Sequence, residues 1–495
     1  SANASVAGAV TVDGGNIVVD ANLNTTGGNA AGDVLLKASG NIALEAGKSL
    51  VTSGGDITLW SNSDGETANG GSIYLKDGVT LDSRTSSDRA ANNGTTDDVA
   101  GGAITLGGGS ASITLASGTL APTGYAINNS SAFRGGINIG TEVVAERRNS
   151  AVTILSGGGD ISLKGQQLSK YNGDSAGINA YEGFTLDAGK TGDITLMGSA
   201  LDATASYSDG LNLGNYAVTA GGTASYIRTV DGDISIQGSA ANATVQSRGV
   251  TLAGGGAGIN IQSSGAGSIE INGTPGGTGT QYNILLIGAN VLAKSGAIEL
   301  TGGSTGKVFN DFFASSIGYK AGSDITSSSA DITVTGDDFD LSSGFNFNTA
   351  GTLTIQPYSG SFIDAFDTSQ LTYSSDLSGL TIGKAGNAEN VSIGSAATIA
   401  GDVTVFAGDI AIDAGLTATG FNVNLHASGA VTQSAAISAS GLGLHGTGNF
   451  TLTNTGNSIS TLAGGNSTTK LGNVNVVNSG ALTIGTVNPT GITST

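Results

Sequence analysis

The sequence predicts an all-β chain folded as a parallel β-solenoid, with three short strands in each rung of about 20 residues. Three features lead to this prediction: a short phrase repeats near the C-terminus, apolar and polar residues alternate within it, and glycine separates the copies. The chain has 83 glycines in 495 residues, against roughly 7% in ordinary proteins. A solenoid accommodates this glycine because each rung needs several corners and only a thin core.

The repeat is clearest between residues 401 and 495. Its first apolar column holds Val403, Val423 and Leu442, at steps of 20 and 19 residues. The last copy lags by 32 residues from Leu442 to Val474, which predicts a loop inserted at residues 464–470. Two further columns follow the first: Ile410, Val431, Phe450 and Leu482 in the second, and Leu416, Ile437, Ile459 and Val487 in the third.

One position in this repeat departs from the pattern. Gln433 stands where the partner of Val431 should be apolar. It is expected either at a corner or in a hydrogen-bonded ladder inside the solenoid.

A shorter phrase, Gly-x-Ile-x-Leu or Gly-x-Ile-x-Ile, recurs through the first 300 residues. Its alternation with period two places the two apolar residues inside and the residue between them outside. The copies begin at Gly55, Gly71, Gly102, Gly159, Gly192, Gly232, Gly267 and Gly296.

Polar insertions separate these phrases, and they are predicted to form lateral loops that leave the rung stack intact. They cover residues 61–71, 82–102, 165–183 and 198–222. The last two insertions contain the candidate ligand-contacting residues, Tyr171, Tyr181, Tyr207 and Tyr216.

The composition divides the chain into three predicted segments. Residues 1–308 form an irregular β-helix with insertions, 309–375 an aromatic-rich continuation, and 376–495 regular rungs. Eight of the thirteen Phe fall in the middle segment: Phe309, Phe312, Phe313, Phe339, Phe345, Phe347, Phe362 and Phe366. We expect them to fill a widened core, and the alternative is a strand pair packed against the side of the solenoid.

Charge and composition exclude several classes of function. A net charge of −20 disfavours nucleic acid and anionic membrane surfaces as partners. No apolar run is long enough for a membrane span, so membrane insertion is not expected. Cysteine is absent, which removes disulfides and thiolate metal sites. The Gly-rich runs lack the Lys-Ser/Thr of a phosphate loop, and no cofactor is predicted.

Two groups of residues could form chemical sites. His426 and His445 share a column of adjacent rungs and could approach one metal ion, but two imidazoles make an incomplete site, so no metal is predicted. Asp337, Asp338 and Asp340 could serve a glycoside hydrolase or a polysaccharide lyase. The nearest basic candidate is Lys320, and no Arg follows Arg248. A solvated strand edge explains the carboxylates more simply, and no catalytic residue is predicted.

The stretch 353–495 resembles filamentous-haemagglutinin-like surface proteins of bacteria. The matching phrases are Leu353-Thr-Ile-Gln-Pro-Tyr-Ser-Gly-Ser-Phe362, Leu380-Thr-Ile-Gly-Lys-Ala-Gly-Asn387, Ala397-Thr-Ile-Ala-Gly-Asp402 and Ala481-Leu-Thr-Ile-Gly-Thr-Val-Asn-Pro-Thr-Gly-Ile-Thr-Ser494. The resemblance implies a right-handed parallel β-helix, exported to the cell surface or beyond, which serves adhesion or matrix building.

We therefore expect a structural and adhesive segment of an extracellular or cell-surface fibre, not an enzyme. Its expected partner is a glycan or protein on a host or neighbouring cell. The alternative is a carbohydrate-active β-helix enzyme, which should gather its insertions and aspartates around one cleft. The strand-like patterns at residues 6–12 and 492–495 further predict a longer parent chain or end-to-end stacking of separate chains into fibres.

Overall fold

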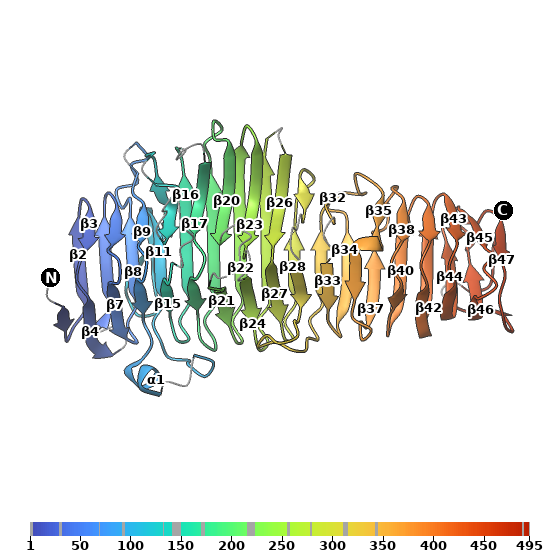
Figure 1. Ribbon diagram of the computed structural model, residues 1–495, viewed down its shortest axis with the longest axis horizontal. Helices are drawn as coiled ribbons and strands as arrows, with labels where there is room; N and C mark the ends of the chain where they lie inside the picture. Colours follow the sequence, from blue (N-terminus) through green and yellow to red (C-terminus); the bar gives the residue numbers. More distant parts are fainter. Residues whose placement is uncertain are drawn as a thin grey trace. The chain divides into compact units, whose positions relative to one another are not determined.

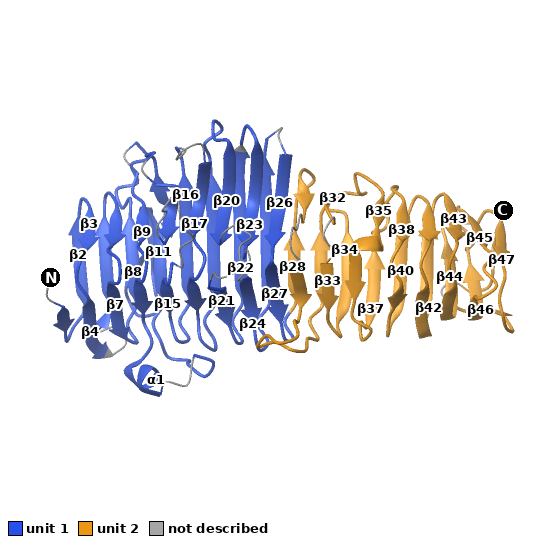
Figure 2. Cartoon of the chain, viewed as in Figure 1, with its two compact units in different colours: residues 1–296 blue, residues 297–495 orange. Residues whose placement is uncertain are grey.

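The computed structural model describes residues 3–28, 32–68, 70–91, 95–131, 133–140, 150–169, 174–214, 223–254, 258–277, 280–309, 315–341, 345–487 and 490–494. The chain divides into two compact units, Ser1–Gly296 and Ala297–Thr495 (Figure 2). Long parallel sheets dominate both units, which confirms the predicted all-β class.

Unit 1 contains three sheets whose strands alternate along the chain (Figure 1), and their pairs are parallel except for the antiparallel pair of β11 and β12. The first sheet contains β1 (Ala4–Val6), β4 (Leu23–Gly28), β7 (Ser49–Ser53), β10 (Thr80–Asp82), β15 (Thr153–Leu155), β18 (Thr185–Asp187), β21 (Ser225–Thr229), β24 (Ile259–Ser263) and β27 (Ala289–Ala293). The second contains β2 (Val10–Gly14), β5 (Val34–Ala38), β8 (Ile57–Ser61), β11 (Ile104–Thr114), β12 (Leu120–Gly124), β13 (Ala126–Asn128), β16 (Ile161–Gln167), β19 (Ile194–Ala200), β22 (Ile234–Asn242) and β25 (Ile269–Gly276). The third contains β3 (Ile17–Val19), β6 (Ile42–Leu44), β9 (Ile73–Leu75), β14 (Gly135–Ile139), β17 (Asp174–Ala180), β20 (Tyr207–Gly214), β23 (Gln246–Ala253) and β26 (Thr280–Ile287).

The Gly-x-Ile-x-Leu phrase builds the second sheet of unit 1. Each Ile lies on the Ile of the next copy, in the pairs Ile57–Ile104, Ile104–Ile161, Ile161–Ile194, Ile194–Ile234 and Ile234–Ile269. All of these side chains are fully buried, which confirms the predicted inward register. The copy at Gly71 differs, because Ile73 pairs with Ile42 and Ile137 in the third sheet.

The glycine that opens the Gly-x-Ile-x-Leu phrase and the residue after it connect each rung to the next. A Cβ built on Gly232 would lie 2.0 Å from the carbonyl oxygen of Gly192, so glycine is required where these backbones meet. The carboxylate of Asp193 accepts the backbone N–H of Asp233 at 2.8 Å, and Asp233 accepts that of Ser268 at 2.8 Å. This ladder satisfies corner amides that the sheets leave unpaired.

Two predicted loops of unit 1 are partly strands. The insertions at 165–183 and 198–222 contain the ends of β16 and β19 and much of β17 and β20, so the prediction of plain loops was wrong for these parts. The strands of the third sheet lengthen from three residues in β9 to eight in β20 (Figure 1). Here the sheets approach closely: a Cβ on Gly198 would lie 2.1 Å from the Gly210 oxygen.

The insertion at 82–102 contains a short helix. Helix α1 (Ser86–Ala91) buries none of its residues. Arg84 and Arg89 bind the buried Asp82 at 2.8 and 3.3 Å, and Asp187 accepts Arg228 at 2.6 Å. Asp98 is 2% exposed beside these groups, and burial raises its pKa to about 6.

Unit 2 also consists of parallel sheets (Figure 1). Its longest ladder contains β28 (Ile298–Thr301), β31 (Ile332–Thr335), β34 (Thr352–Gln356), β37 (Gly379–Ile382), β39 (Ala397–Thr398), β40 (Asp402–Ala407), β42 (Leu416–Ala427), β44 (Ile437–His445), β46 (Ser458–Gly464) and β48 (Thr483–Ile484). The others contain β30 (Ser315–Gly318), β33 (Phe345–Asn348) and β36 (Leu371–Tyr373); β29 (Lys307–Val308) and β32 (Asp338–Phe339); and β35 (Phe366–Asp367), β38 (Val391–Ile393), β41 (Ile410–Ile412), β43 (Ala430–Gln433), β45 (Asn449–Leu452) and β47 (Val474–Val476). A short 3-10 helix, η2 (Thr368–Gln370), follows β35.

The first and second predicted columns of the C-terminal repeat are confirmed in its first three copies. Val423 pairs with Val403 and Leu442 and is fully buried. The second column pairs Ile410 with Val431 and then Phe450.

The register predicted for the last copy is wrong. Leu462, not Val474, pairs with Leu442, and Val474 instead pairs with Phe450 in the neighbouring sheet. The polar residues at 465–470 therefore form a corner between β46 and β47. The third column is also shifted, because Ile459 pairs with Ala439 and not with Ile437.

The departure at Gln433 proves to be a hydrogen-bonded pair. Its amide nitrogen donates to Oδ1 of the fully buried Asn457 at 2.9 Å, and its amide oxygen accepts from Asn457 Nδ2 at 2.8 Å. The two side chains thus satisfy each other inside the repeat.

Phenylalanine fills the interior of the first part of unit 2. Phe309, Phe345 and Phe347 are almost fully buried, and the rings of Phe309 and Phe345 stack with centroids 4.5 Å apart. Phe312 and Phe313 lie outside the described residues. Phe309, Phe345 and Phe347 thus belong to the core, whereas Phe339 is half-buried.

Candidate functional site: a phenylalanine and aspartate cavity

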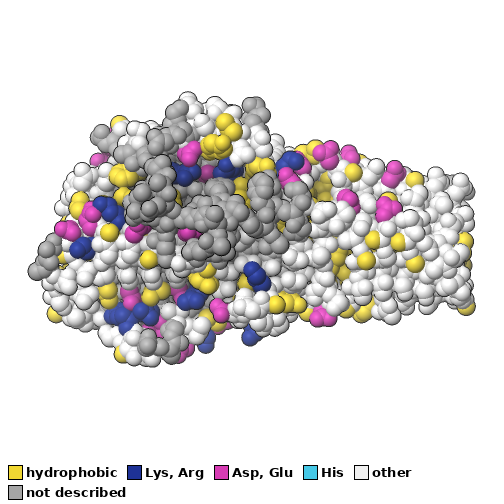
Figure 3. Space-filling model, viewed as in Figure 1, with side chains coloured by type: hydrophobic (Ala, Val, Ile, Leu, Met, Phe, Trp, Pro, Cys, Tyr) yellow, Lys and Arg dark blue, Asp and Glu magenta, His cyan; other side chains and the backbone are white. Residues whose placement is uncertain are grey.

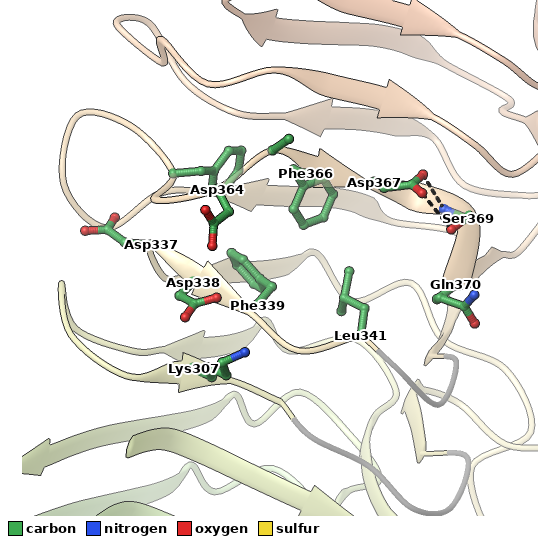
Figure 4. A pocket seen from close by; sticks show the side chains of 12 residues that line it. Lys307, Asp337, Asp338, Phe339, Leu341, Asp364, Phe366, Asp367, Ser369 and Gln370 are labelled. Atoms are coloured by element: carbon green, nitrogen blue, oxygen red, sulfur yellow. Dashed lines mark hydrogen bonds between the residues drawn. The ribbon is translucent and has the colours of Figure 1, made fainter. Parts of the chain in front are cut away.

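A cavity of about 350 Å³ opens in unit 2 between β29, β32, β35 and η2 (Figure 4). It is lined by Lys307, Asp337, Asp338, Phe339, Leu341, Phe362, Asp364, Ala365, Phe366, Asp367, Ser369 and Gln370. These residues come from three stretches of the chain, 307, 337–341 and 362–370, which the sheets bring together.

Strand pairing places the basic residue beside the first acidic one. In the parallel pair of β29 and β32, Lys307 lies opposite Asp338, and Val308 lies opposite Phe339. Val308 is fully buried while Lys307 and Asp338 are half-buried. The pairing therefore places Lys307 and Asp338 next to each other in the cavity lining, beside the buried Val308.

Three phenylalanine rings form the apolar wall. Phe362 and Phe366 stack with centroids 5.1 Å apart, and both are 4% exposed. Phe339 meets Phe362 and Phe366 edge-on, at 5.8 and 5.4 Å. Such edge-to-face contacts hold rings in fixed orientations. Phe339 is the half-buried member of the trio.

The four aspartates that line the cavity differ in their hydrogen bonds and orientation. Asp337 is buried and accepts the backbone N–H of Ser359 at 2.8 Å. Asp367 caps η2, accepting from the Ser369 backbone N–H at 2.9 Å and from its hydroxyl at 2.8 Å. In Figure 4 the carboxylates of Asp338 and Asp364 instead converge on the space beside Phe339. These two are the acidic groups best placed to meet a ligand.

Burial raises the pKa of Asp338 above its usual value. Lys307 opposes this effect by favouring the charged carboxylate, whereas Asp364 and Asp340 add to it by repulsion. The cavity therefore holds more negative charge than its single lysine neutralises.

Of the residues predicted from the sequence as a possible acid and base, only some line the cavity. Asp338 lines the cavity as a candidate acid, but Lys320 is exposed and does not belong to the lining. Lys307 was missed because it lies 31 residues before Asp338 and becomes its neighbour only through strand pairing. The alternation of Lys307 with the buried Val308 was the available signal.

The four candidate tyrosines are not brought together within the described residues. Tyr171 and Tyr216 lie outside them. Tyr207 begins β20, is 37% exposed and lies under the guanidinium of Arg248, at 5.3 Å from the ring centroid. Tyr181 is half-buried and follows β17, whereas Tyr207 pairs with the first residue of that strand, Asp174. The two rings therefore belong to opposite ends of a seven-residue strand.

The two histidines form a stack in unit 2. The rings of His426 and His445 lie 4.0 Å apart at an angle of 7°, and Phe406 stacks on His426 at 4.3 Å. Burial, and secondly the charge of His445, lower the pKa of His426 to about 4; burial also lowers that of His445. Among the residues that the structure describes, no three His, Cys, Asp or Glu side chains are grouped as metal ligands.

No family model, curated protein or solved structure matches the chain. In the described part of the chain, no helix has the length and apolar character needed to cross a membrane.

Proposed function

We propose that the chain is a structural and adhesive segment of a bacterial surface or extracellular fibre, and that the cavity in unit 2 binds a glycan of a host or neighbouring cell. The proposed architecture is a right-handed β-helix with three strands in each rung. Supporting this, strands paired within unit 1 are commonly three apart in chain order, as in β16, β19, β22 and β25. Parallel crossover connections are right-handed in about 98% of cases.

The observation that carries the binding role is the cavity itself. Its volume of about 350 Å³ falls in the range of roughly 300–1,000 Å³ of small-molecule sites. A phenylalanine ring offers an apolar face to the C–H groups of a sugar, and carboxylates accept hydrogen bonds from its hydroxyls. Ser369 and Gln370 add further polar groups to the lining. Because the site rests on paired strands, little ordering is needed when a ligand binds.

A carbohydrate-active enzyme is the second candidate, and one observation favours it. Burial raises the pKa of Asp338, and the charge of the nearby Asp364 adds to this effect. Glycoside hydrolases pair a protonated with an ionised carboxylic acid in this manner. The two proposals differ in outcome, since an adhesive site releases its glycan intact while an enzyme shortens it.

A glycan array with reducing ends measured in parallel tests the proposal. Phe339→Ala removes the half-buried ring of the cavity, and Phe421→Ala removes an exposed ring of the same unit outside it. We expect binding to glycans that Phe339→Ala abolishes and Phe421→Ala preserves, with no new reducing ends. Release of reducing ends that depends on Asp338 would establish the enzyme instead, and equal binding by both variants would remove the cavity from the account.

A further inference from the structure

We propose that the cavity selects a cationic amino sugar, such as a β-linked glucosamine oligomer with free amines, over neutral and acidic sugars. This inference rests on the proposed glycan-binding role and specifies the class of glycan. The juxtaposition that carries it is a half-buried phenylalanine ring beside two converging carboxylates in one cavity.

The first argument is the balance of charge around the cavity. Its lining contains four aspartates and one lysine. Hydrogen bonds fix the carboxylates of Asp337 and Asp367 in place. Residues 297–495 as a whole contain fourteen Asp or Glu, four Lys and no Arg. A cationic ligand is therefore attracted both by the cavity and by the field of its unit.

The visible surface of unit 2 agrees with this balance. On the face shown in Figure 3, acidic side chains of unit 2 are scattered over the surface and basic ones are rare. The negative charges of unit 2 would repel sulfated sugars and uronic acids. At ordinary salt this repulsion acts within about 8–10 Å and is screened beyond that distance. Negative glycans are thus disfavoured before they reach the carboxylates.

The second argument is where the carboxylates lie. Lys307 is paired in register with Asp338, so its ammonium compensates that side of the cavity. Asp364 comes from a different stretch of chain and is exposed. The charges of Asp364 and Asp340 help to raise the pKa of Asp338, so these carboxylates repel that of Asp338. An ammonium group placed between Asp338 and Asp364 would relieve this repulsion and donate hydrogen bonds to both carboxylates.

The third argument is the aromatic wall. An ammonium, or the polarised C–H groups next to it, is attracted to the face of an aromatic ring within about 6 Å of its centroid. Phe339 is held by Phe362 and Phe366 and cannot turn away without losing both contacts. A lysine side chain would satisfy the charge but would offer no hydroxyl to the amide of Gln370, as a sugar does.

The test compares three probes by calorimetry on the whole chain: a glucosamine trimer, an N-acetylglucosamine trimer and a lysine trimer, at pH 6 and low salt. We expect the glucosamine trimer to bind about tenfold more tightly than its acetylated form, the effect of one partly desolvated charge pair. Raising the salt should reduce that preference. Asp364→Asn should bring the two sugars within about twofold, while Asp376→Asn, an exposed aspartate outside the cavity, should leave the preference intact.

Different failures separate this inference from the proposed function. Equal binding of the two sugar trimers, lost in Phe339→Ala, would overturn the amino-sugar preference and leave a glycan-binding cavity. Tighter binding of the lysine trimer would overturn the sugar class. A preference for glucosamine that survives Asp364→Asn but disappears in Asp376→Asn would place the cation elsewhere on the surface.

Discussion

The replacement of Gly232 by alanine tests the rung-to-rung contact of unit 1. The new Cβ would lie 2.0 Å from the oxygen and 2.6 Å from the carbon of the Gly192 carbonyl. The oxygen contact is about 1.4 Å inside the 3.4 Å at which ordinary contact begins. Because the obstacle is backbone and not a flexible side chain, β19 and β22 must separate. Overpacking of this kind costs about 1–3 kcal/mol, and a rigid backbone contact belongs at the upper end.

The matched control is Gly15→Ala in the same unit. A Cβ at Gly15 has no neighbour within 4 Å, so the same chemical change should be neutral or stabilise by up to about 1 kcal/mol through the unfolded chain. Urea unfolding gives the size of each effect, and hydrogen exchange locates it. We expect faster exchange in β19 and β22 for Gly232→Ala alone. Equal midpoints and unchanged exchange in both variants would refute the close approach of these rungs.

Three further predictions concern the core and the buried titratable groups. Val423→Asp should lower the free energy of unfolding of unit 2 by about 3 kcal/mol or more, because it buries an unpaired carboxylate. Asn424→Asp, on the half-buried outer face, should leave the free energy of unfolding nearly unchanged in the same denaturation assay. The fold lowers the pKa of His426 to about 4, so the folded state favours the neutral ring. The contribution of His426 to stability should therefore be present above pH 6.5 and lost as the pH falls toward 4. His426→Phe should weaken this acid sensitivity in thermal melts. Asp98 has the opposite sign, because its pKa is raised to about 6: its contribution is full below pH 3.8 and is lost as the pH rises through 6, so Asp98→Asn should stabilise unit 1 at pH 7 and flatten that part of its pH profile.

The sequence was most informative where one alternating phrase repeats without change. Ile104, Ile161 and Ile194 could be assigned to one buried column because period two fixes which side chains face inward. The phrase does not specify its sheet, and so Ile73 was placed in the wrong column. The C-terminal repeat likewise does not show at which corner a loop is inserted. For this reason the sequence predicted Val474 in the first column, whereas it lies in the second.

Two kinds of feature were beyond pattern reading. The ends of β19 and β20 look polar because the two sheets meet there through Gly198 and Gly210 and bury little apolar surface. The cavity could be foreseen only in part: the aspartates and phenylalanines of 337–366 were noted, but Lys307 joins them through a strand pair of two residues each. Strands this short carry too little pattern to predict their partner.

The claim that the cavity holds a glycan without cleaving it is tested most directly by recovering the bound ligand. An oligosaccharide labelled at its reducing end is equilibrated with the protein across a dialysis membrane, and the retained fraction is then analysed by mass spectrometry. We predict retention of a chain of unchanged length, lost in Phe339→Ala and kept in Phe421→Ala. A shortened labelled product, or retention that does not depend on Phe339, would contradict the account.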